Sequence, residues 1–173
     1  MSLRSELLNA ARTEALEDLL SEHGHTNSVV RRLVTLVGDK DETIQTRAIW
    51  LLKQMAQDQF PFRHEHLIAL FGSLPELTHW LSKLNFCQML QHLPIPKQST
   101  GNLIWFLERN LLDENRFLRA WSYSGFYELA KQHPEYFGYA AEQLERADLE
   151  NAASVKARIR NIQKAMSKLP RKN

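Results

Sequence analysis

The sequence has little of what marks several large protein classes. Among 173 residues there is one cysteine, Cys87, which excludes an intramolecular disulfide framework and a zinc site built from cysteines. Six glycines and six prolines are too few for a collagen-like or linker-dominated chain. No apolar run approaches the roughly 18 residues of a membrane-spanning helix, and residues 1–22 lack the apolar core of a signal peptide. We therefore expect a cytoplasmic protein in a reducing environment.

Catalytic motifs are absent as well. The sequence contains no glycine-rich phosphate loop, no Gly-x-Ser-x-Gly turn and no His-Glu-x-x-His motif. The pairs His23–His25 and His64–His66 have a spacing of two residues, which points the two rings to different sides of a helix. Cys87 lies in an apolar helical segment without a neighbouring base, as a buried structural cysteine does. We expect no enzyme activity, no metal site and no cofactor.

Charge is balanced over the chain but not along it. Lysine and arginine number 22 against 20 acidic residues, and seven of the basic residues lie within residues 155–173, which contain no acid. The rest of the chain is therefore mildly acidic. A basic end can contact nucleic acid or an acidic partner, or it can be the solvated face of a last helix. The basic residues of this segment are Lys156, Arg158, Arg160, Lys164, Lys168, Arg171 and Lys172.

Apolar residues recur every three to four positions along almost the whole chain, which predicts an all-α protein. The first such pattern predicts one amphipathic helix over residues 3–23 that ends at Gly24. A third helix is predicted to bury an apolar face made of Ile44, Ala48, Leu51, Leu52 and Met55. Four large aromatic residues fall at helical spacing with leucines and are predicted to lie in the core: Trp80, Trp105, Phe106 and Trp121.

A repeat of about 36 residues is the most informative pattern in the sequence. Residues 41–48 and 113–120 are identical at four of eight positions, including an aspartate and an Arg-Ala pair. Lys83 lies midway, 36 residues from Arg47 and 36 from Arg119. A single helix pair of this length cannot bury its apolar face, whereas neighbouring pairs can bury a continuous core. The predicted pairs cover residues 26–58, 62–93, 97–132 and 134–169.

These residues resemble the HEAT-repeat family, whose motif is an apolar first helix, a turn with aspartate, and Val-Arg followed by small apolar residues on the second helix. Residues 33–52 and 107–130 fit this motif, and residues 155–157 resemble a last, basic version of it. The middle repeat departs from the motif, with Leu77 in place of aspartate and Leu84 in place of alanine. The whole chain is similar to small stand-alone bacterial HEAT-like proteins. The resemblance implies a right-handed α-solenoid of about four helix pairs, with the N-terminal helix as a cap.

The resemblance also suggests where a partner would bind. Solenoids offer a concave surface formed by their second helices, so we expect a non-enzymatic scaffold that binds a protein partner there. The Asp41–Arg47 and Asp113–Arg119 steps resemble the ladder of polar contacts that joins neighbouring repeats in HEAT proteins. A structural role and a binding role both remain open for the two arginines. Lys83 lacks an aspartate at the equivalent place and is expected to be free. The candidate partner-binding row is Arg47, Trp50, Lys83, Arg119 and Tyr123.

Two other functions remain as alternatives. The chain could bind nucleic acid, in the way that the HEAT-like alkylpurine DNA glycosylases do. Trp50, Trp121, Asp113 and the basic C-terminal segment favour this idea, but no motif of those enzymes aligns residue by residue. A bilin-attaching lyase of HEAT-like fold is a further possibility that rests on fold analogy alone.

Overall fold

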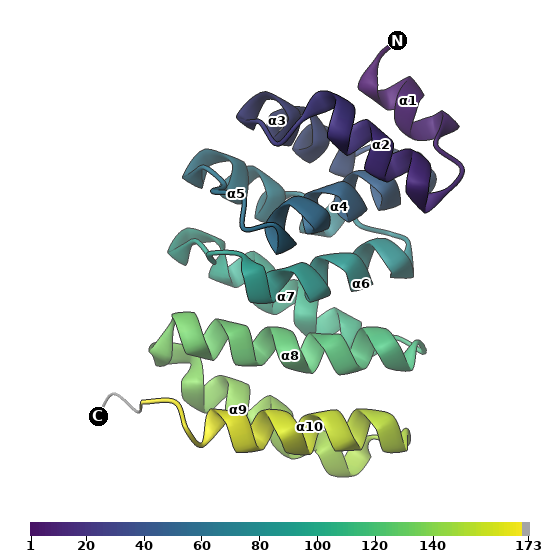
Figure 1. Cartoon of the computed structure of the whole chain (residues 1–173). Coiled ribbons are helices and arrows are strands. Elements are labelled where there is room, and N and C mark those ends of the chain that lie inside the picture. Colours follow the sequence, from purple (N-terminus) through teal and green to yellow (C-terminus); the bar gives the residue numbers. More distant parts are fainter. Residues whose placement is uncertain (171–173) are drawn as a thin grey trace.

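The computed structural model describes residues 1–170 as stacked α-helices with no strand in that range (Figure 1). This confirms the predicted all-α class. Short 3₁₀ turns join several helices, over Leu74–Glu76, Leu90–His92, Lys97–Ser99, Pro134–Tyr136 and Arg146–Leu149. The α-helices are α1 (Leu3–Asn9), α2 (Thr13–His23), α3 (Asn27–Val37), α4 (Glu42–Gln57), α5 (His64–Gly72), α6 (Trp80–Met89), α7 (Thr100–Asn110), α8 (Arg116–Gln132), α9 (Phe137–Glu145) and α10 (Ala153–Met166).

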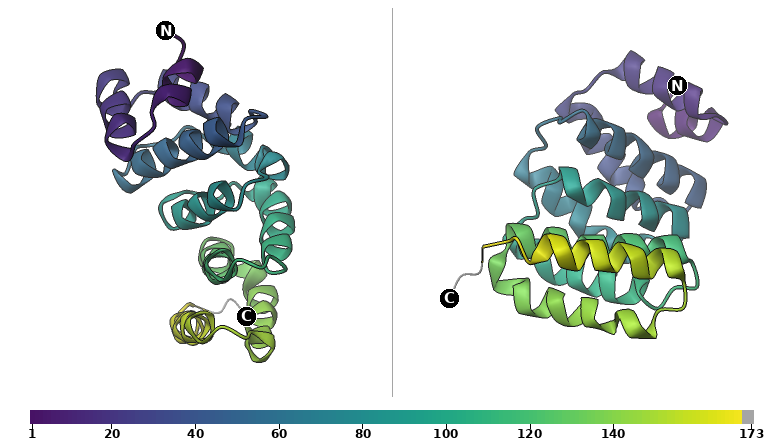
Figure 2. Two further views of the ribbon diagram at one scale, coloured as in Figure 1. Left: turned by 90° about the vertical axis from the view of Figure 1, so that its right-hand side faces the viewer. Right: turned by 60° about the horizontal axis from the view of Figure 1, so that its bottom comes forward.

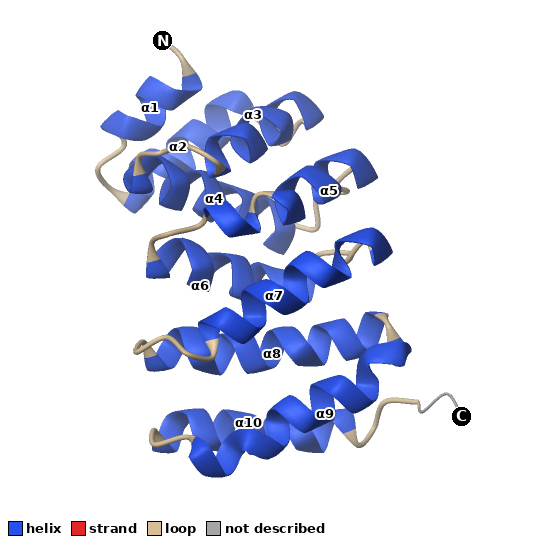
Figure 3. Cartoon of the chain, turned by 180° about the vertical axis from the view of Figure 1, so that it is seen from behind, coloured by secondary structure: helices blue, strands red, loops and turns tan. Residues whose placement is uncertain are grey.

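The helices form two layers of an α-solenoid. The second helices α4, α6, α8 and α10 pack one against the next, whereas contacts between the first helices α3, α5, α7 and α9 are sparser. Closer packing in one layer than in the other bends the array. Figure 2 shows the resulting shallow arc in its left panel, with α2, α4, α6, α8 and α10 on the inner side. Figure 3 shows the outer layer from behind, where α3, α5, α7 and α9 lie in front.

Side chains that begin the helices explain much of the local structure. The Asp41 carboxylate accepts hydrogen bonds from the backbone N–H groups of Thr43 and Ile44 at the start of α4. The Asn115 side chain accepts from Phe117 and Leu118 in the same way at the start of α8. Such caps satisfy N–H groups that have no partner within the helix. They fix the residue at which each second helix begins.

The prediction of one helix over residues 3–23 is wrong, because two helices, α1 and α2, meet at a break around Ala10. The intervening sequence contains no glycine or proline, so local preference alone favours a continuous helix. Arg47 of α4 provides the reason: its guanidinium donates to the carbonyls of Leu7 and Leu8, at 2.6 and 2.9 Å. It thereby supplies a donor to carbonyl groups in the last turn of α1, where the donors of the helix backbone run out. Because of this break, both α1 and α2 pack on α4.

The core runs without interruption from α1 to α10. Rings from three successive helices interlock, since Phe86 makes edge-to-face contacts with Phe71 at 5.3 Å and with Phe106 at 5.4 Å between centroids. Hydrogen bonds between side chains repeat at the predicted period, with Thr46–Ser82 and Thr100–Tyr136 each joining residues 36 apart. The predicted apolar face of α4 is confirmed, because all five of its residues are buried: Ile44, Ala48, Leu51, Leu52 and Met55.

Two of the predicted core tryptophans lie at the surface. Trp80 is 40% exposed and Trp105 is 42% exposed, whereas Phe106 is buried and Trp121 is half-buried. Trp80 is the first residue of α6, because Leu74–Glu76 forms a separate 3₁₀ turn and residues 77–79 are not helical. Helical spacing assigns Trp80 to the apolar face of a helix, but the buried residues of α6 begin only after it in the chain.

Gly125 allows α8 to lie close to its neighbours. A Cβ atom at this position would be 2.6 Å from Cδ2 of Leu107 in α7 and 3.2 Å from Cδ1 of Leu90. Both leucines are fully buried, so they have little room to move. The glycine thus permits the close helix crossing in the centre of the third pair, although it weakens the helix on its own.

We predict that Gly125→Ala lowers the free energy of unfolding by about 1–2 kcal/mol, because the added methyl group overpacks the core. The matched control is Gly138→Ala in α9, where a Cβ would meet nothing within 4 Å. This control is expected to preserve stability or raise it slightly. Chemical denaturation of both variants is the measurement, and equal stability of Gly125→Ala and the unmodified protein would contradict the packing argument.

Candidate functional site

The N-caps place the second helices in a common register. The caps of α4, α6, α8 and α10 are Asp41, His79, Asn115 and Ala152. Counting from each cap, the sixth and ninth residues fall on one face of the helix, since three residues make nearly one turn. We call these positions the inner row. Its residues are Arg47 and Trp50 on α4, Asn85 and Gln88 on α6, Trp121 and Ser124 on α8, and Arg158 and Asn161 on α10, and we count with them Lys53, three residues beyond Trp50 on α4.

Two long cationic side chains connect the inner row from helix to helix. Lys53 of α4 reaches α6, where its ammonium donates to the side-chain oxygens of Asn85 at 2.6 Å and Gln88 at 3.0 Å. At the other end, Arg158 of α10 donates to the Ser124 hydroxyl at 3.0 Å. The guanidinium of Arg158 also lies 4.1 Å from the centre of the Trp121 ring, a close cation–π contact.

The residues of the inner row on α4 and α6 line a hollow that α2 also borders. Its volume is about 400 Å³, and Arg47, Trp50 and Lys53 form one wall while Leu81, Leu84, Asn85 and Gln88 of α6 form the other. None of the described residues that line this hollow is acidic. Burial lowers the pKa of Lys53, and no charged group offsets that effect. The hollow is therefore a partly apolar, cationic surface.

The candidate residues predicted from the 36-residue spacing do not form one site. Arg47 and Trp50 line the inner hollow, and Arg119 and Tyr123 line a second hollow of about 360 Å³ at the turn between α9 and α10. Lys83 lines a third hollow of about 320 Å³, with Trp105 and Arg109 of α7. Within residues 1–170, the Lys83 side chain forms no hydrogen bond and no ion pair.

The helix caps explain why the five residues separate. Lys83 and Arg119 are each the fourth residue after an N-cap, where α4 has Gln45. Asp113 accepts the backbone N–H of Asn115 at 2.8 Å, and Asp39 accepts that of Asp41 at 2.9 Å. By geometry Asp113 therefore corresponds to Asp39. The Asp-Arg alignment that pairs Asp113 with Asp41 is shifted by two residues, which moves Arg47 onto another face of its helix.

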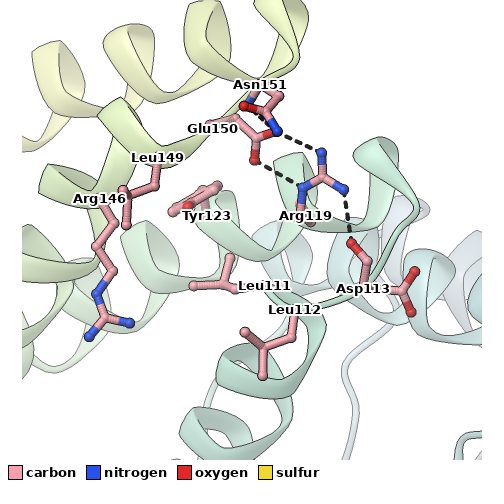
Figure 4. Close-up of a pocket in the computed structure, with 9 residues that line it drawn as sticks. All are labelled: Leu111, Leu112, Asp113, Arg119, Tyr123, Arg146, Leu149, Glu150 and Asn151. Carbon is pink, nitrogen blue, oxygen red and sulfur yellow. Dashed lines mark hydrogen bonds and ion pairs between the residues drawn. The ribbon is translucent and has the colours of Figure 1, made fainter.

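Arg119 is part of a structural tie between the last two repeats. Its guanidinium makes two hydrogen bonds to the Glu150 carboxylate, at 2.9 and 2.7 Å, and two more to the backbone carbonyls of Asp113 and Glu114. Figure 4 shows Arg119 between Glu150 and the turn that contains Asp113, beside the buried Tyr123. The hydrogen bonds from Arg119 hold the pKa of Glu150 below its ordinary value.

Gln45 makes the corresponding tie in the first repeat. Its buried amide donates to the carbonyl of Glu76 at 2.9 Å and accepts the N–H of Thr78 at 3.1 Å. Gln132 uses the same arrangement at the other end of α8, donating to the Leu93 carbonyl and accepting from Ile95. A buried backbone group must find a partner, and these glutamines supply two partners each to a loop of the chain. Fixed loops in turn hold the inner row in place.

The basic C-terminal residues lie on different faces of the last helix. Arg158 belongs to the inner row, whereas Lys156, Arg160 and Lys164 follow one another at intervals of four residues and so share another face. Lys168 follows the end of α10, and Arg171 and Lys172 lie outside the described residues. The predicted basic patch is therefore a line of three residues plus Lys168.

A family model described as a HEAT repeat domain matches residues 3–166 of the chain. The chain belongs to the HEAT repeat family. No curated protein and no solved structure matches it. Membership of this family agrees with the stacked helix pairs and supports a helical repeat scaffold.

Other potential chemistry in this HEAT repeat protein is limited. Cys87 is buried between Ser122 and Asn110, and burial raises its pKa to about 12, so the thiol stays protonated. Among residues 1–170, no group of three His, Cys, Asp or Glu side chains is arranged to hold a metal ion. In the same range, no helix combines the length and apolar character needed to cross a membrane.

Sequence reasoning missed Lys53, Asn85, Gln88 and Glu150. A signal for Asn85 and Gln88 was present, because each second helix has a polar or aromatic pair three residues apart where the apolar pattern pauses. Alignment on the N-caps would have found these pairs, whereas alignment on the Asp-Arg motif concealed them. Glu150 follows a short 3₁₀ turn, and nothing in its local sequence indicates a partner 31 residues earlier.

We predict that Arg119→Ala lowers the free energy of unfolding by about 2–3 kcal/mol, since Glu150 would lose its charged partner. The side chains of this pair are only 17% and 5% exposed. Lys83→Ala is the matched comparison and is expected to change stability by less than about 0.5 kcal/mol. Urea titrations of the two variants test the distinction. A loss of stability in Lys83→Ala that equals the loss in Arg119→Ala would refute it.

Acid titration tests the Glu150 tie in a second way. Because the pKa of Glu150 is lowered in the folded state, its carboxylate stabilises the fold above its ordinary pKa of 4.5, and this contribution is lost as the pH falls below that value. Glu150→Gln should therefore be less stable than the unmodified protein at pH 7, and the difference should shrink as the pH falls below 4.5. Unfolding free energies measured from pH 7 to pH 3 provide the test, and parallel profiles would contradict it.

Proposed function

We propose that this HEAT repeat protein is a non-enzymatic scaffold that binds a protein partner on its concave surface. The observation that carries the proposal is the inner row, in which Trp50 and Trp121 occur with Arg47 and Arg158 in half-buried positions on three of the four second helices, α4, α8 and α10. Tryptophan and arginine are the residues that most often dominate binding at protein interfaces. The inner side of a solenoid offers such residues on an extended surface.

Family membership supports the scaffold part of this proposal. HEAT repeats present one face of each second helix to a partner, while the rest of the repeat builds the core. In this chain, polar residues near the start of the second helices already form hydrogen bonds within the fold, as the pairs Arg119–Glu150 and Gln45–Thr78 show. Within the described part of the chain, the hydrogen-bond partners of Lys53 and Arg158 are all neutral. The inner row is thus a surface with hydrogen-bonding and charge capacity left for a partner.

Nucleic-acid binding is the second candidate function. The line formed by Lys156, Arg160 and Lys164 favours it, because none of the three side chains has an ion pair within residues 1–170. Each phosphate contact releases a counterion, so such binding would weaken steeply as salt is added. Three aligned cations on one helix make a small footprint for this purpose.

We predict that Trp50→Ala reduces capture of the protein partner at least tenfold in a pull-down from the lysate of the source organism, because it removes an aromatic anchor. Trp105→Ala on the outer-layer helix α7 is the matched control and should bind normally. Gln88→Glu keeps the size of the side chain, places a negative charge in the row and should also weaken capture. Thermal unfolding of each variant separates lost binding from lost folding.

Nuclease treatment of the lysate distinguishes the two candidate functions. Partners that remain bound after treatment, and that are lost with Trp50→Ala, support the scaffold. Release of all bound material by nuclease, with capture that depends on Lys156, Arg160 and Lys164, would instead support nucleic-acid binding.

A further inference from the structure

The inner row contains two half-buried cations that have no carboxylate partner within residues 1–170. The Lys53 ammonium donates two hydrogen bonds to the neutral side-chain oxygens of Asn85 and Gln88, and the Arg158 guanidinium donates one to the neutral Ser124 hydroxyl. Burial lowers the pKa of both groups, and no carboxylate within residues 1–170 offsets that cost. Partly buried cations are ordinarily paired, because desolvation without a counterion is unfavourable.

We propose that the inner row binds an acidic segment of the protein partner, with one carboxylate on Lys53 and a second on Arg158. This inference rests on the proposed scaffold function and specifies the chemistry of its ligand. The hollow beside Lys53 is lined by Leu81, Leu84 and Trp50, so an apolar side chain next to the first carboxylate has a place to pack. The surface therefore fits a segment that alternates acidic and apolar residues.

The helix register gives the spacing of the two carboxylates. Lys53 lies over positions six and nine of α6, and Arg158 lies over the same two positions of the adjacent helix α8. Neighbouring packed helices are about 8–10 Å apart. An extended chain covers about 3.3 Å per residue. The acidic residues of the segment should thus be about three positions apart, on a chain that crosses the second helices.

The charge on the rest of the chain favours a peptide over a nucleic acid as the ligand of the inner row. Only Arg47, Lys53 and Arg158 contribute positive charge along the inner row, and the hydrogen bonds from Arg47 go to the carbonyls of α1. Outside residues 155–173 the chain has more acidic than basic residues. A nucleic acid backbone would meet this net repulsion over its whole length, whereas a short segment with two carboxylates meets the two cations.

The experiment is selection of a random twelve-residue peptide library displayed on phage against the immobilised full chain. Enriched peptides are expected to contain two acidic residues about three positions apart, with an apolar residue between or beside them. Dissociation constants of the enriched peptides are then measured by fluorescence anisotropy. Lys53→Gln and Arg158→Gln should each weaken binding at least tenfold, because each removes a charge-assisted hydrogen bond. Replacing the peptide's own glutamates by glutamine should do the same.

Matched variants outside the inner row control for loss of charge alone. Lys83→Gln removes a half-buried lysine from the other side of α6. Arg109→Gln removes an arginine that lies over a tryptophan, 5.0 Å from the ring of Trp105, on the outer-layer helix α7. Both variants should bind the selected peptides as the unmodified protein does. Circular dichroism confirms that all four variants are folded.

Each other outcome overturns the proposal in a recognisable way. A library that yields no binders, or binders without acidic enrichment, contradicts the acidic ligand. Binders that are unaffected by Lys53→Gln and Arg158→Gln contradict its location. A duplex DNA of twenty base pairs that binds through these two residues identifies a nucleic acid instead. A partner that is captured from lysate through Trp50 but is indifferent to Lys53 and Arg158 preserves the scaffold function while refuting this inference.

Discussion

The packing of each second helix onto the next determines where the other features of the protein lie. One helix pair buries too little apolar surface to be stable, so α4, α6, α8 and α10 depend on one another for a continuous core. The hydrogen bond between Thr46 and Ser82 joins α4 to α6, while the close approach at Gly125 fixes the depth of α8 against α7. Equivalent positions of successive helices therefore align. The inner row exists because of that alignment.

Polar residues in this protein fall into two groups with different tasks. Near the turns, Arg119 and Glu150 bond to each other and to loop backbone, and Gln45 bonds to the backbone of another loop, so their hydrogen-bonding capacity is used within the fold. In the inner row, the groups among residues 1–170 that hold Lys53 and Arg158 in place are neutral. Neutral partners orient a cation without neutralising it. The same scaffold thus keeps its structural charges paired and leaves its candidate binding charges available.

Sequence patterns predicted those features that depend on local periodicity. The all-α class, the 36-residue period and the buried face of α4 follow from the spacing of apolar residues. The break between α1 and α2 did not, because it depends on Arg47, which lies about 40 residues away in the chain and meets the carbonyls at the end of α1 only in the folded state. Trp80 shows a similar limit, since its exposure depends on where α6 begins.

The candidate site was only partly predictable. Arg47 and Trp50 were found because they follow a conspicuous motif, whereas Lys53 and Gln88 become related only when α4 packs on α6. The Asp-Arg alignment was off by two residues because insertions in the turns shift sequence spacing relative to the helix caps. Hydrogen bonds at the N-caps, which sequence identity does not weigh, define the structural register.

The most direct test of the binding surface is photo-crosslinking in the lysate of the source organism. A benzophenone side chain is placed at Gln88, in the centre of the inner row, and in a second sample at Arg32, an exposed residue of the outer-layer helix α3. The proposed function predicts a discrete protein crosslinked from position 88 and none from position 32. Crosslinking from position 32 alone, or equal labelling from both positions, would contradict the assignment of the concave surface as the binding site.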